Sequence, residues 1–347
     1  MPHKLALIGF GTVGQGLAEI LKDKAGQLRT EYGFEVQVVA VSNSKGAIYH
    51  PDGLDIHRLL AAVQESGRLD RYPDTPGLVR GWDSLTTIRD SNADTIVEVA
   101  WTDLHTGQPA IDHVRAAFEA GKHVVTSNKG PAALAYHQLK RLAEAHGVQW
   151  GIEGTLMSGT PALRLAQVAL AGCHIHEIRG ILNGTTNFIL TQMESGATYA
   201  DALAEAQGLG YAEADPTADV EGHDALGKLL ILAAVVMGAP LTREQVTCQG
   251  ITRLTSEDIQ QARAEGRRWK LIAHLRRVGN QLEASVGPQA LPYSNPLAGV
   301  SGATNAITYV TDLLGEVTLV GPGAGRRETG FALLADLLDI HKASFSS

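Results

Sequence analysis

The feature that most constrains the fold is a glycine-rich turn close to the start of the chain. A short apolar run at residues 4–8 leads into "GFGTVG" at 9–14, and residues 15–26 then carry apolar side chains at helical spacing. Residues 35–41, "EVQVVAV", have the pattern of a second buried strand. A strand, turn, helix and strand in this order predict a parallel sheet of the α/β class.

The three glycines of this turn, Gly9, Gly11 and Gly14, form the pattern G-x-G-x-x-G. In a dinucleotide-binding turn the first allows the tight bend, the second lets the backbone approach a pyrophosphate, and the third lets helix and strand pack closely. The N-terminus of the following helix then faces the phosphates. A plain glycine-rich turn is the alternative, but the position directly after a strand favours dinucleotide binding.

The end of the second strand bears on the choice between NAD and NADP. Chains that bind NAD usually carry an acid here, which binds the ribose hydroxyls. This strand ends in Ser42-Asn43-Ser44-Lys45 instead, and Lys45 could meet a 2′-phosphate. The sequence therefore leans towards NADP, with a solvated turn lysine as the alternative interpretation.

Further alternation of strand and helix patterns continues the parallel sheet. Strand patterns at 94–100 and 122–127 are followed by helical patterns at 110–121 and 132–147.

Beyond residue 150 the organisation changes. Strands expected at 176–184 and 282–291 are separated by a helix after Gly222 and another at 256–276, which is typical of an α+β domain. The strand, turn and helix expected at 319–340 are taken to return to the first domain. We therefore predict a dinucleotide-binding domain formed by 1–150 and 316–347, and a second domain at 151–315.

Composition excludes several classes of partner. The net charge of −8 and the lack of basic clusters argue against nucleic acid. No basic amphipathic helix suggests a membrane surface. The most apolar stretch, 229–237, is far shorter than the roughly 20 residues that span a bilayer. Cys173 and Cys248 form no disulfide framework, so we expect a cytoplasmic protein.

A lysine with a cluster of acids before it marks the second candidate site. Five carboxylates, those of Glu213, Asp215, Asp219, Glu221 and Asp224, precede Lys228. If a helix begins near Gly222, Asp224 and Lys228 face each other at i and i+4. The helix beyond is apolar on all sides and therefore buried, so the lysine needs a partner and is a candidate proton donor. A structural ion pair, a solvated acidic face and a divalent-cation site are the alternatives.

Other polar residues give weaker signals. Lys129, in "TSNKGPAAL", follows a strand end, where open α/β sheets bind ligands, although a surface turn lysine is an equal alternative. His174 and His176 share a strand face, but no second ligand pair at zinc spacing follows them.

Five segments together resemble the homoserine dehydrogenases. They are "IGFGTVGQGL", "HVVTSNKGPAAL", "GILNGTTNFIL", "GYAEADPTADVEGHDALGKLLILA" and "GPGAG", in the family's order between residues 7 and 325. That family interconverts L-aspartate 4-semialdehyde and L-homoserine with NAD(P)H, in the biosynthesis of threonine, methionine and isoleucine. The resemblance implies a Rossmann-type dinucleotide-binding domain, an α+β domain for catalysis and dimerisation, and a homodimer.

The resemblance also assigns residues. Lys228 becomes the proton donor, and Lys129 lies at the cofactor and substrate. Glu213 and Asp224 match substrate-binding acids, Asp219 matches a third acid of the site, and Gly184 and Thr185 match a substrate-contacting turn. Positions expected at the dinucleotide are Gly9, Phe10, Gly11, Thr12, Val13, Gly14, Lys45, Thr102, Ser127, Lys129 and Gly325. The family's monovalent-cation site, for Na⁺ or K⁺, maps to Glu153, Leu156, Ser158 and Thr160.

Two departures from the family pattern concern the cofactor. Trp101 stands where the family often has Pro or Gly, and Arg326 and Arg327 follow Gly325 where the family often has a further glycine. An arginine at that point would either touch a phosphate or face solvent.

The short segment after Gly325 has a regulatory consequence. The 22 residues that follow it resemble one helix, so we expect no threonine-binding regulatory domain and no cooperative inhibition by threonine.

Two other functions compete with this assignment. An acylating semialdehyde dehydrogenase would need a thiolate nucleophile, and neither cysteine has a suitable setting. A non-catalytic dinucleotide sensor would keep the glycine turn but would not need Lys228 beside Asp224.

Overall fold

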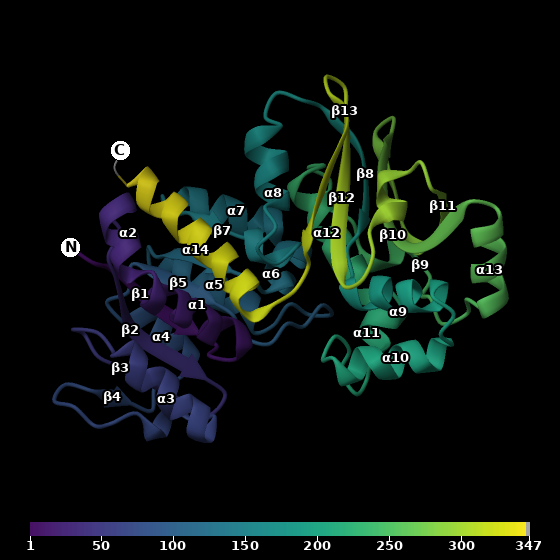
Figure 1. Cartoon of the computed structure of the whole chain (residues 1–347). Coiled ribbons are helices and arrows are strands. Elements are labelled where there is room, and N and C mark those ends of the chain that lie inside the picture. Colours follow the sequence, from purple (N-terminus) through teal and green to yellow (C-terminus); the bar gives the residue numbers. More distant parts are fainter. Residues whose placement is uncertain (345–347) are drawn as a thin grey trace. The chain divides into compact units, whose positions relative to one another are not determined.

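The computed structural model describes residues 1–344 and divides the chain into two units. The first comprises residues 1–159 together with the chain from Gly325 onward, and the second comprises residues 160–324 (Figure 1). The chain therefore leaves the first unit once and returns to it with its last helix.

The first unit contains a seven-stranded sheet in the order β4-β3-β2-β1-β5-β6-β7. Five strands are parallel: β1 (His3–Ile8), β2 (Val36–Asn43), β5 (Thr95–Glu98), β6 (His123–Thr126) and β7 (Trp150–Gly151). Two antiparallel strands, β3 (Gly46–Tyr49) and β4 (Val79–Arg80), extend one edge. This is the Rossmann-type parallel sheet that the glycine turn predicts.

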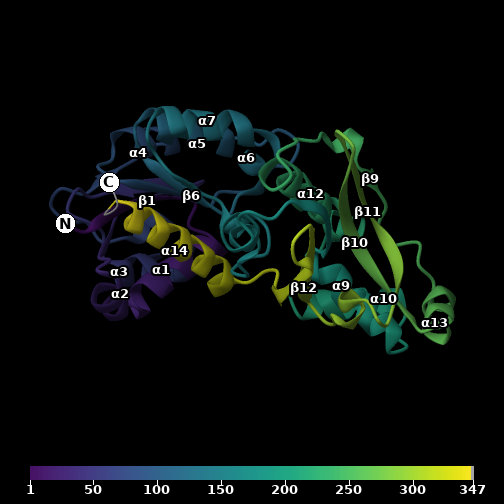
Figure 2. The ribbon, with the colours of Figure 1, turned by 90° about the horizontal axis from the view of Figure 1, so that it is seen from above.

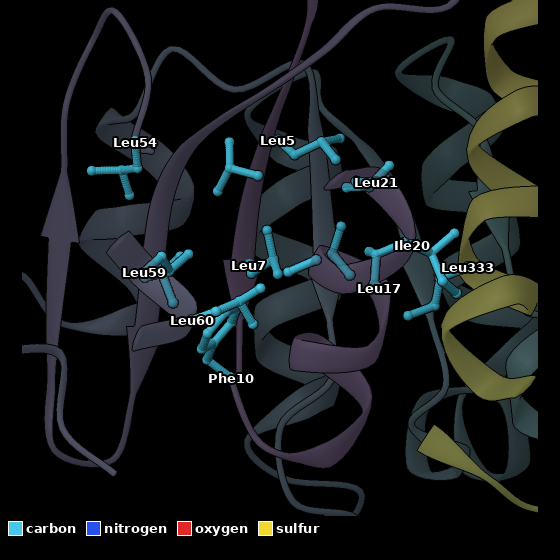
Figure 3. Packing of buried hydrophobic residues seen from close by; sticks show 14 of the residues in the cluster. Leu5, Leu7, Phe10, Leu17, Ile20, Leu21, Leu54, Leu59, Leu60 and Leu333 are labelled. Atoms are coloured by element: carbon cyan, nitrogen blue, oxygen red, sulfur yellow. The ribbon is translucent and has the colours of Figure 1, made fainter. Parts of the chain in front are cut away.

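Helices cover both faces of this sheet. One apolar core joins β1 to α1 (Thr12–Asp23), α3 (Ile56–Ser66) and α14 (Arg326–Ala343), and Figure 3 shows leucines from all four elements meeting there. The opposite core lies under α4, α5 and α7. The remaining bounds are α2 (Ala25–Tyr32), α4 (Ser84–Asp90), α5 (Ala110–Glu119), α6 (Lys129–Leu134) and α7 (Tyr136–Ala145).

The returning helix α14 packs against α1 through glycines and ion pairs. Side chains at Gly16 or Gly330 would clash with the facing helix backbone. Arg326 binds Glu19 with its Nη2 2.6 Å from Oε1, and Arg327 Nη1 lies 2.9 Å from Asp23 Oδ2. The two arginines after "GPGAG" thus fasten α14 to α1, which neither interpretation of them had foreseen. Figure 2 shows α14 beside α1.

The second unit is built on a six-stranded sheet in the order β13-β12-β8-β10-β11-β9. Its strands are β8 (Ile175–Ile181), β9 (Thr247–Cys248), β10 (Arg267–Val278), β11 (Gln281–Pro292), β12 (Thr304–Thr311) and β13 (Gly315–Pro322). All pairings are antiparallel except that of β9 with β11. The helices are α8 (Ala162–Arg164), α9 (Gly184–Glu194), α10 (Tyr199–Gly208), α11 (Thr217–Val220), α12 (His223–Val235) and α13 (Ser256–Ala264), and a single π-helical turn spans Leu165–Ala169.

The helix expected at 256–276 is wrong over its second half. α13 ends at Ala264, and Gly266, with φ of 72°, turns the chain into β10. Leu271, Ala273 and Leu275 then alternate with period two along a strand that pairs with both β8 and β11. Tertiary pairing therefore overrides a local pattern that also suited a helix.

The domain bounds also differ from those expected. β13 pairs with β12, so residues up to 324 belong to the second sheet and the return to the first unit comes at Gly325 rather than at 316. At the other crossing, residues 151–159 stay with the first unit. Within residues 1–344, no helix has the length and apolar character needed to cross a membrane.

The α1–α14 contact gives a test of the fold. Gly16→Ala should destabilise the chain by about 1–3 kcal/mol, because the new methyl group overlaps the carbonyl of Arg326. Gly26→Ala is the matched control: Gly26 is also helical, has no atom within 4 Å of the added carbon, and should be neutral or slightly stabilising. Urea unfolding midpoints measure both, and equal stability of the two variants would contradict the packing described.

Candidate functional site

The glycine turn between β1 and α1 has the geometry of an anion-binding loop. Gly9 has φ of 101°, and a side chain there would overlap the Val99 carbonyl, while a Cβ at Gly14 would lie 2.8 Å from the Gly9 oxygen. Gly11, by contrast, has open space around it and caps α1 without a side-chain hydrogen bond. The first and third glycines are thus required by packing, and the second leaves the helix N-terminus accessible to a phosphate.

The other residues predicted for this loop differ in what they expose. The Phe10 side chain is buried in the apolar core beside Leu60 (Figure 3), so only its backbone belongs to the loop, where its carbonyl accepts a hydrogen bond from Gln15 Nε2 at 3.0 Å. Thr12 is exposed, and Val13 is half-buried. Any contact of Phe10 with a dinucleotide therefore involves backbone atoms.

Asn128 organises the carboxyl ends of β5 and β6. Its Nδ2 donates to the carbonyls of Ala100 and Trp101 at 3.3 and 3.2 Å, and its Oδ1 accepts from the amide of Gly130 at 3.1 Å. The same side chain thus caps α6, which begins at Lys129, and fixes the segment before Thr102. Thr102, Ser127 and Lys129 are half-buried around it, and the Trp101 side chain is 78% exposed.

A fully buried carboxylate lies beneath this segment. Glu98, the last residue of β5, has Oε1 3.3 Å from His113 Nδ1 and accepts at its backbone oxygen from Thr126 Oγ1 at 2.6 Å. His113 Nε2 in turn lies 2.8 Å from Ser84 Oγ. Sequence reasoning missed this network, although an acid inside the apolar pattern "TIVEVA" was a visible signal.

Lys45 lies in the exposed turn between β2 and β3. Its backbone amide donates to Asn43 Oδ1 at 2.8 Å, and its side chain reaches the C-terminal end of α3 at Gly67. Gly325, at the other end of the predicted cofactor set, caps α14 with φ of 143°.

The second unit brings Lys228 and its acids together. α12 begins at His223, and Lys228 lies in its second turn, 6% exposed. Its Nζ is 3.0 Å from Asp224 Oδ2 and donates to the backbone oxygen of Leu182 at 2.6 Å. The expected i,i+4 pair is present, and the Leu182 carbonyl is a partner that the sequence did not indicate.

Asn183 connects this pair to a second carboxylate. It caps α9, where its Oδ1 accepts from the Thr186 amide at 2.9 Å. Its Nδ2 donates to Asp219 Oδ1 at 2.6 Å and to Asp224 Oδ2 at 3.1 Å. Asn183 was missing from the predicted site, although an asparagine before "GTTN" is a recognisable helix N-cap signal.

The surroundings of Asp219 disfavour its ionisation. Burial raises the pKa of Asp219, and the nearby Asp224 carboxylate raises it further, while the Asn183 hydrogen bond and the Lys228 charge act in the opposite direction. The cluster thus holds a cation between acids, one of which keeps its proton more tightly than an exposed aspartate does.

The predicted substrate turn lies beside this cluster. A Cβ at Gly184 would be 2.6 Å from the Ala303 oxygen, so the position accepts only glycine. Thr185 Oγ1 donates to the Tyr211 carbonyl at 2.6 Å, which ties α9 to the loop that carries the acids. Glu213, on the same loop, has an exposed side chain. Of the predicted site residues, the structure therefore joins Lys228, Asp224 and Asp219, while Lys129 belongs to the first unit.

The residues predicted to hold a monovalent cation fall on both sides of the boundary between the units. Glu153, Leu156 and Ser158 are buried in the first unit, and Ser158 has φ of 54°, unusual for a residue with a side chain. Thr160 begins the second unit, where its Oγ1 donates to the Pro322 carbonyl at 2.9 Å. Among residues 1–344 there is no cluster of three or more His, Cys, Asp or Glu side chains suited to a metal ion. His174 and His176 therefore belong to no such cluster.

Comparison with known proteins identifies the family. The family model for the NAD-binding domain of homoserine dehydrogenase matches residues 9–153, and the homoserine dehydrogenase model matches residues 161–338. The chain belongs to the homoserine dehydrogenase family. It is 46% identical over 344 residues to an "NAD(+)-dependent homoserine dehydrogenase" of Pseudomonas canavaninivorans, covering 99% of this chain and 97% of that one.

Other members of the family are similar over the same extent. A homoserine dehydrogenase of Methanocaldococcus jannaschii is 41% identical, with 98% of this chain and 99% of the relative covered. The crystal structure of a putative homoserine dehydrogenase from Archaeoglobus fulgidus matches with a TM-score of 0.88 at 38% identity, covering 97% and 99%. A hyperthermophilic archaeal homoserine dehydrogenase in complex with NADPH matches with a TM-score of 0.84 at 31% identity, covering 99% and 98%.

The half-buried Asp219 carboxyl gives a stability prediction. Because the folded chain binds the Asp219 proton more tightly than the unfolded chain, ionisation of Asp219 opposes folding at neutral pH. Asp219→Asn should therefore raise the melting temperature at pH 7, and this gain should shrink as the pH falls towards the ordinary aspartate value of 3.8.

Asp215→Asn is the matched control. Hydrogen bonds from Thr217 hold the pKa of this exposed carboxyl below its usual value, so its loss should not stabilise the chain. Thermal melts at pH 7 and pH 4 make the comparison. A destabilised Asp219→Asn variant at pH 7 would show that the ionised carboxylate supports the fold.

Proposed function

We propose that this chain interconverts L-aspartate 4-semialdehyde and L-homoserine, with Lys228 as the acid–base group. The chain's membership of the homoserine dehydrogenase family makes it an NAD(P)-dependent oxidoreductase that acts on a CH–OH group. The observation that carries the proposed role of Lys228 is its buried ammonium group, held between the Asp224 carboxylate and the Leu182 carbonyl.

The hydrogen-bonding capacity of Lys228 suits proton transfer. An ammonium group has three N–H donors, and the contacts to Asp224 and Leu182 account for two. We propose that the third points to the substrate oxygen. In the direction of reduction, the aldehyde carbon gains a hydride and its oxygen gains a proton from Lys228; oxidation returns both. A bound nicotinamide supplies or accepts the hydride.

The surrounding groups favour this transfer. The positive charge of Lys228 would stabilise the alkoxide that develops on the substrate oxygen. Asn183 holds the Asp219 and Asp224 carboxylates in place through its amide group. We propose that these acids and the exposed Glu213 bind the substrate ammonium, with Gly184 and Thr185 forming the turn beneath the substrate.

The glycine turn and the segments around Thr102, Ser127, Lys129 and Gly325 are the proposed dinucleotide site. We propose that the Lys45 side chain binds the 2′-phosphate of NADP and that this chain therefore prefers NADP. The Pseudomonas relative, by contrast, is named for NAD⁺. The ratio of kcat/KM for the two dinucleotides decides between these preferences.

Three further features are proposed from the family resemblance. The buried Glu153 carboxylate and the irregular backbone at 156–158 offer hard oxygen ligands suited to Na⁺ or K⁺. We also propose a homodimer formed through the second unit and a cytoplasmic location. Light scattering measures the oligomeric state, and activity in buffers with and without Na⁺ or K⁺ tests the cation.

The cysteines argue against the acylating alternative. Burial raises the pKa of the Cys248 thiol, the opposite of what an activated thiolate requires. NADPH or NADH oxidation by the purified chain with aspartate semialdehyde, in a buffer without phosphate, tests the proposed reaction. Reduction of NAD⁺ or NADP⁺ by aspartate semialdehyde with a strict requirement for phosphate or another acyl acceptor would favour the rival, and no turnover in either assay would favour a sensor.

Replacing the proposed proton donor gives a direct prediction. Lys228→Met should lower kcat by roughly 10²–10⁴-fold, the usual contribution of general acid–base catalysis, and leave dinucleotide binding largely unchanged. Lys140→Met is the control, because Lys140 forms an exposed i,i+4 pair with Glu144 on α7. A kcat within a few-fold of the wild type would remove Lys228 from the mechanism.

The proposed ammonium ligand is tested separately. Glu213→Gln should lower kcat/KM for homoserine by removing a charge-assisted contact, with little change in the KM of the dinucleotide. Glu257→Gln, an exposed acid at the start of α13, serves as the control. Equal losses for both substrates would count against the assignment of Glu213.

A further inference from the structure

A second buried lysine lies in the same unit, away from the acid cluster. Lys270, on β10, is 1% exposed. Its Nζ donates to the Val300 carbonyl at 2.7 Å and to Asn187 Oδ1 at 3.1 Å. Burying an ammonium group is costly unless hydrogen bonds satisfy it, so these contacts have to be kept in the folded chain.

Asn187 also binds the loop that contains Val300, at residues 300–304. Its Nδ2 lies 3.3, 2.9 and 3.1 Å from the carbonyls of Val300, Gly302 and Thr304. One turn further along α9, Thr191 Oγ1 accepts from the Gly302 amide at 3.1 Å. The loop at 300–304 is therefore fastened to α9 by side chains at two successive turns.

The same loop presses against the first turn of α9. The Ala303 oxygen lies 2.6 Å from where a Cβ at Gly184 would be, so loop and turn are in direct contact. Gly184 follows Asn183, whose amide holds Asp219 and Asp224. Asn183 and Asn187 are one helical turn apart, and they connect α9 to the acids and to the loop respectively.

We propose that Lys270 and Asn187 are positioning residues for the proposed reaction: they hold loop 300–304 against the first turn of α9 and thereby set the place of Asn183 and its two carboxylates. The proposal rests on the proposed function of the acid cluster. It gives Lys270 no contact with the substrate.

The charge on Lys270 responds to mildly alkaline pH. Burial lowers the pKa of Lys270 to about 8; the Glu194 carboxylate, at the end of α9, opposes this shift, and Arg268, on the same strand, adds to it. Burial also raises the pKa of Glu194, against the charges of Lys270, Arg268 and Arg263. A neutral amine binds carbonyl oxygens more weakly than an ammonium group does, so the loop should loosen above this pH.

The kinetic test replaces Lys270 with a neutral side chain of similar length. Lys270→Met should lower kcat/KM for homoserine by roughly 10–100-fold, as expected when catalytic groups shift by a fraction of an ångström to an ångström. The KM of the dinucleotide should stay unchanged. The alkaline limb of the kcat/KM profile for homoserine should move relative to the wild type, because one titrating group is gone.

Lys122→Met is the matched control. Lys122 is also a buried lysine, bound to the carbonyls of Ile88 and Ser91, but it belongs to the first unit, where it directly precedes β6. It should lose stability without the selective effect on homoserine. If Lys270→Met behaves like this control, or keeps homoserine kcat/KM within twofold of the wild type, the proposal is wrong.

A second variant loosens the loop without removing a buried charge. Thr191→Val keeps the side-chain shape but loses the acceptor for the Gly302 amide. It should change homoserine kcat/KM in the same direction by roughly threefold to tenfold, in line with the loss of one hydrogen bond. Unchanged kinetics in this variant would overturn the role of the loop, even if Lys270→Met did not fold.

The titration has a stability signature that does not depend on activity. The unfolded chain holds the lysine proton up to about 10.5, whereas the folded chain releases it near 8. Below pH 8 the folded chain therefore carries the full free-energy cost of burying the Lys270 charge. Between pH 8 and 10.5 this cost adds less and less to the free energy of the folded chain relative to the unfolded chain, so the free energy of unfolding of the wild type should rise relative to that of Lys270→Met. A flat difference in urea midpoints between pH 7 and pH 10 would contradict the titration. Lack of homoserine activity in the wild type would instead contradict the proposed function.

Discussion

The meeting point of β8, α9 and α12 is organised by the need to bury the ammonium group of Lys228. Lys228 begins the apolar part of α12, where an uncompensated charge would be very costly. The contact at i−4 supplies one carboxylate, and the end of β8 supplies a backbone carbonyl. Asp224 then needs its own orientation, which Asn183 provides from the cap of α9. α12 and the end of β8 thus bind the Lys228 ammonium directly, through Asp224 and the Leu182 carbonyl. α9 acts on it indirectly, because Asn183 orients Asp224.

α9 has a second polar connection one turn below the first. At its cap Asn183 faces the acids, and at the next turn Asn187 faces the loop before β12 and the second buried lysine. Both asparagines use the donor and the acceptor end of their amides, so neither helix turn can rotate without breaking hydrogen bonds on two sides. Because both amides are fully hydrogen-bonded, the rotation of α9 about its own axis is fixed more closely than apolar packing alone would fix it.

The glycine turn, the parallel sheet and the pairing of Asp224 with Lys228 could be predicted from sequence, because each is indicated by a local pattern: the order of strand, turn and helix for the first two, and the i,i+4 spacing for the third. The groups that were missed depend on long-range contacts. Asn183 reaches Asp219 and Asp224, and Glu98 meets His113 from another element. β10 was taken for a helix because β8, the strand that pairs with one of its edges, lies far earlier in the chain. Arg326 and Arg327 were expected to touch a phosphate or to face solvent, because their actual partners, Glu19 and Asp23, lie some 300 residues away.

The position of α14 in the chain has a consequence for folding during synthesis. α14 packs on α1 and completes the apolar core of the first unit, yet residues 160–324 separate it from the rest of that unit. At a translation rate of roughly 5–20 residues per second, the ribosome takes on the order of 10–30 s to pass from one part to the other. Throughout this interval the surface of α1 that receives Leu333, Leu334 and Leu337 lacks its covering helix. The second unit is continuous in sequence, so it can finish folding first, although the nascent chain begins with the other.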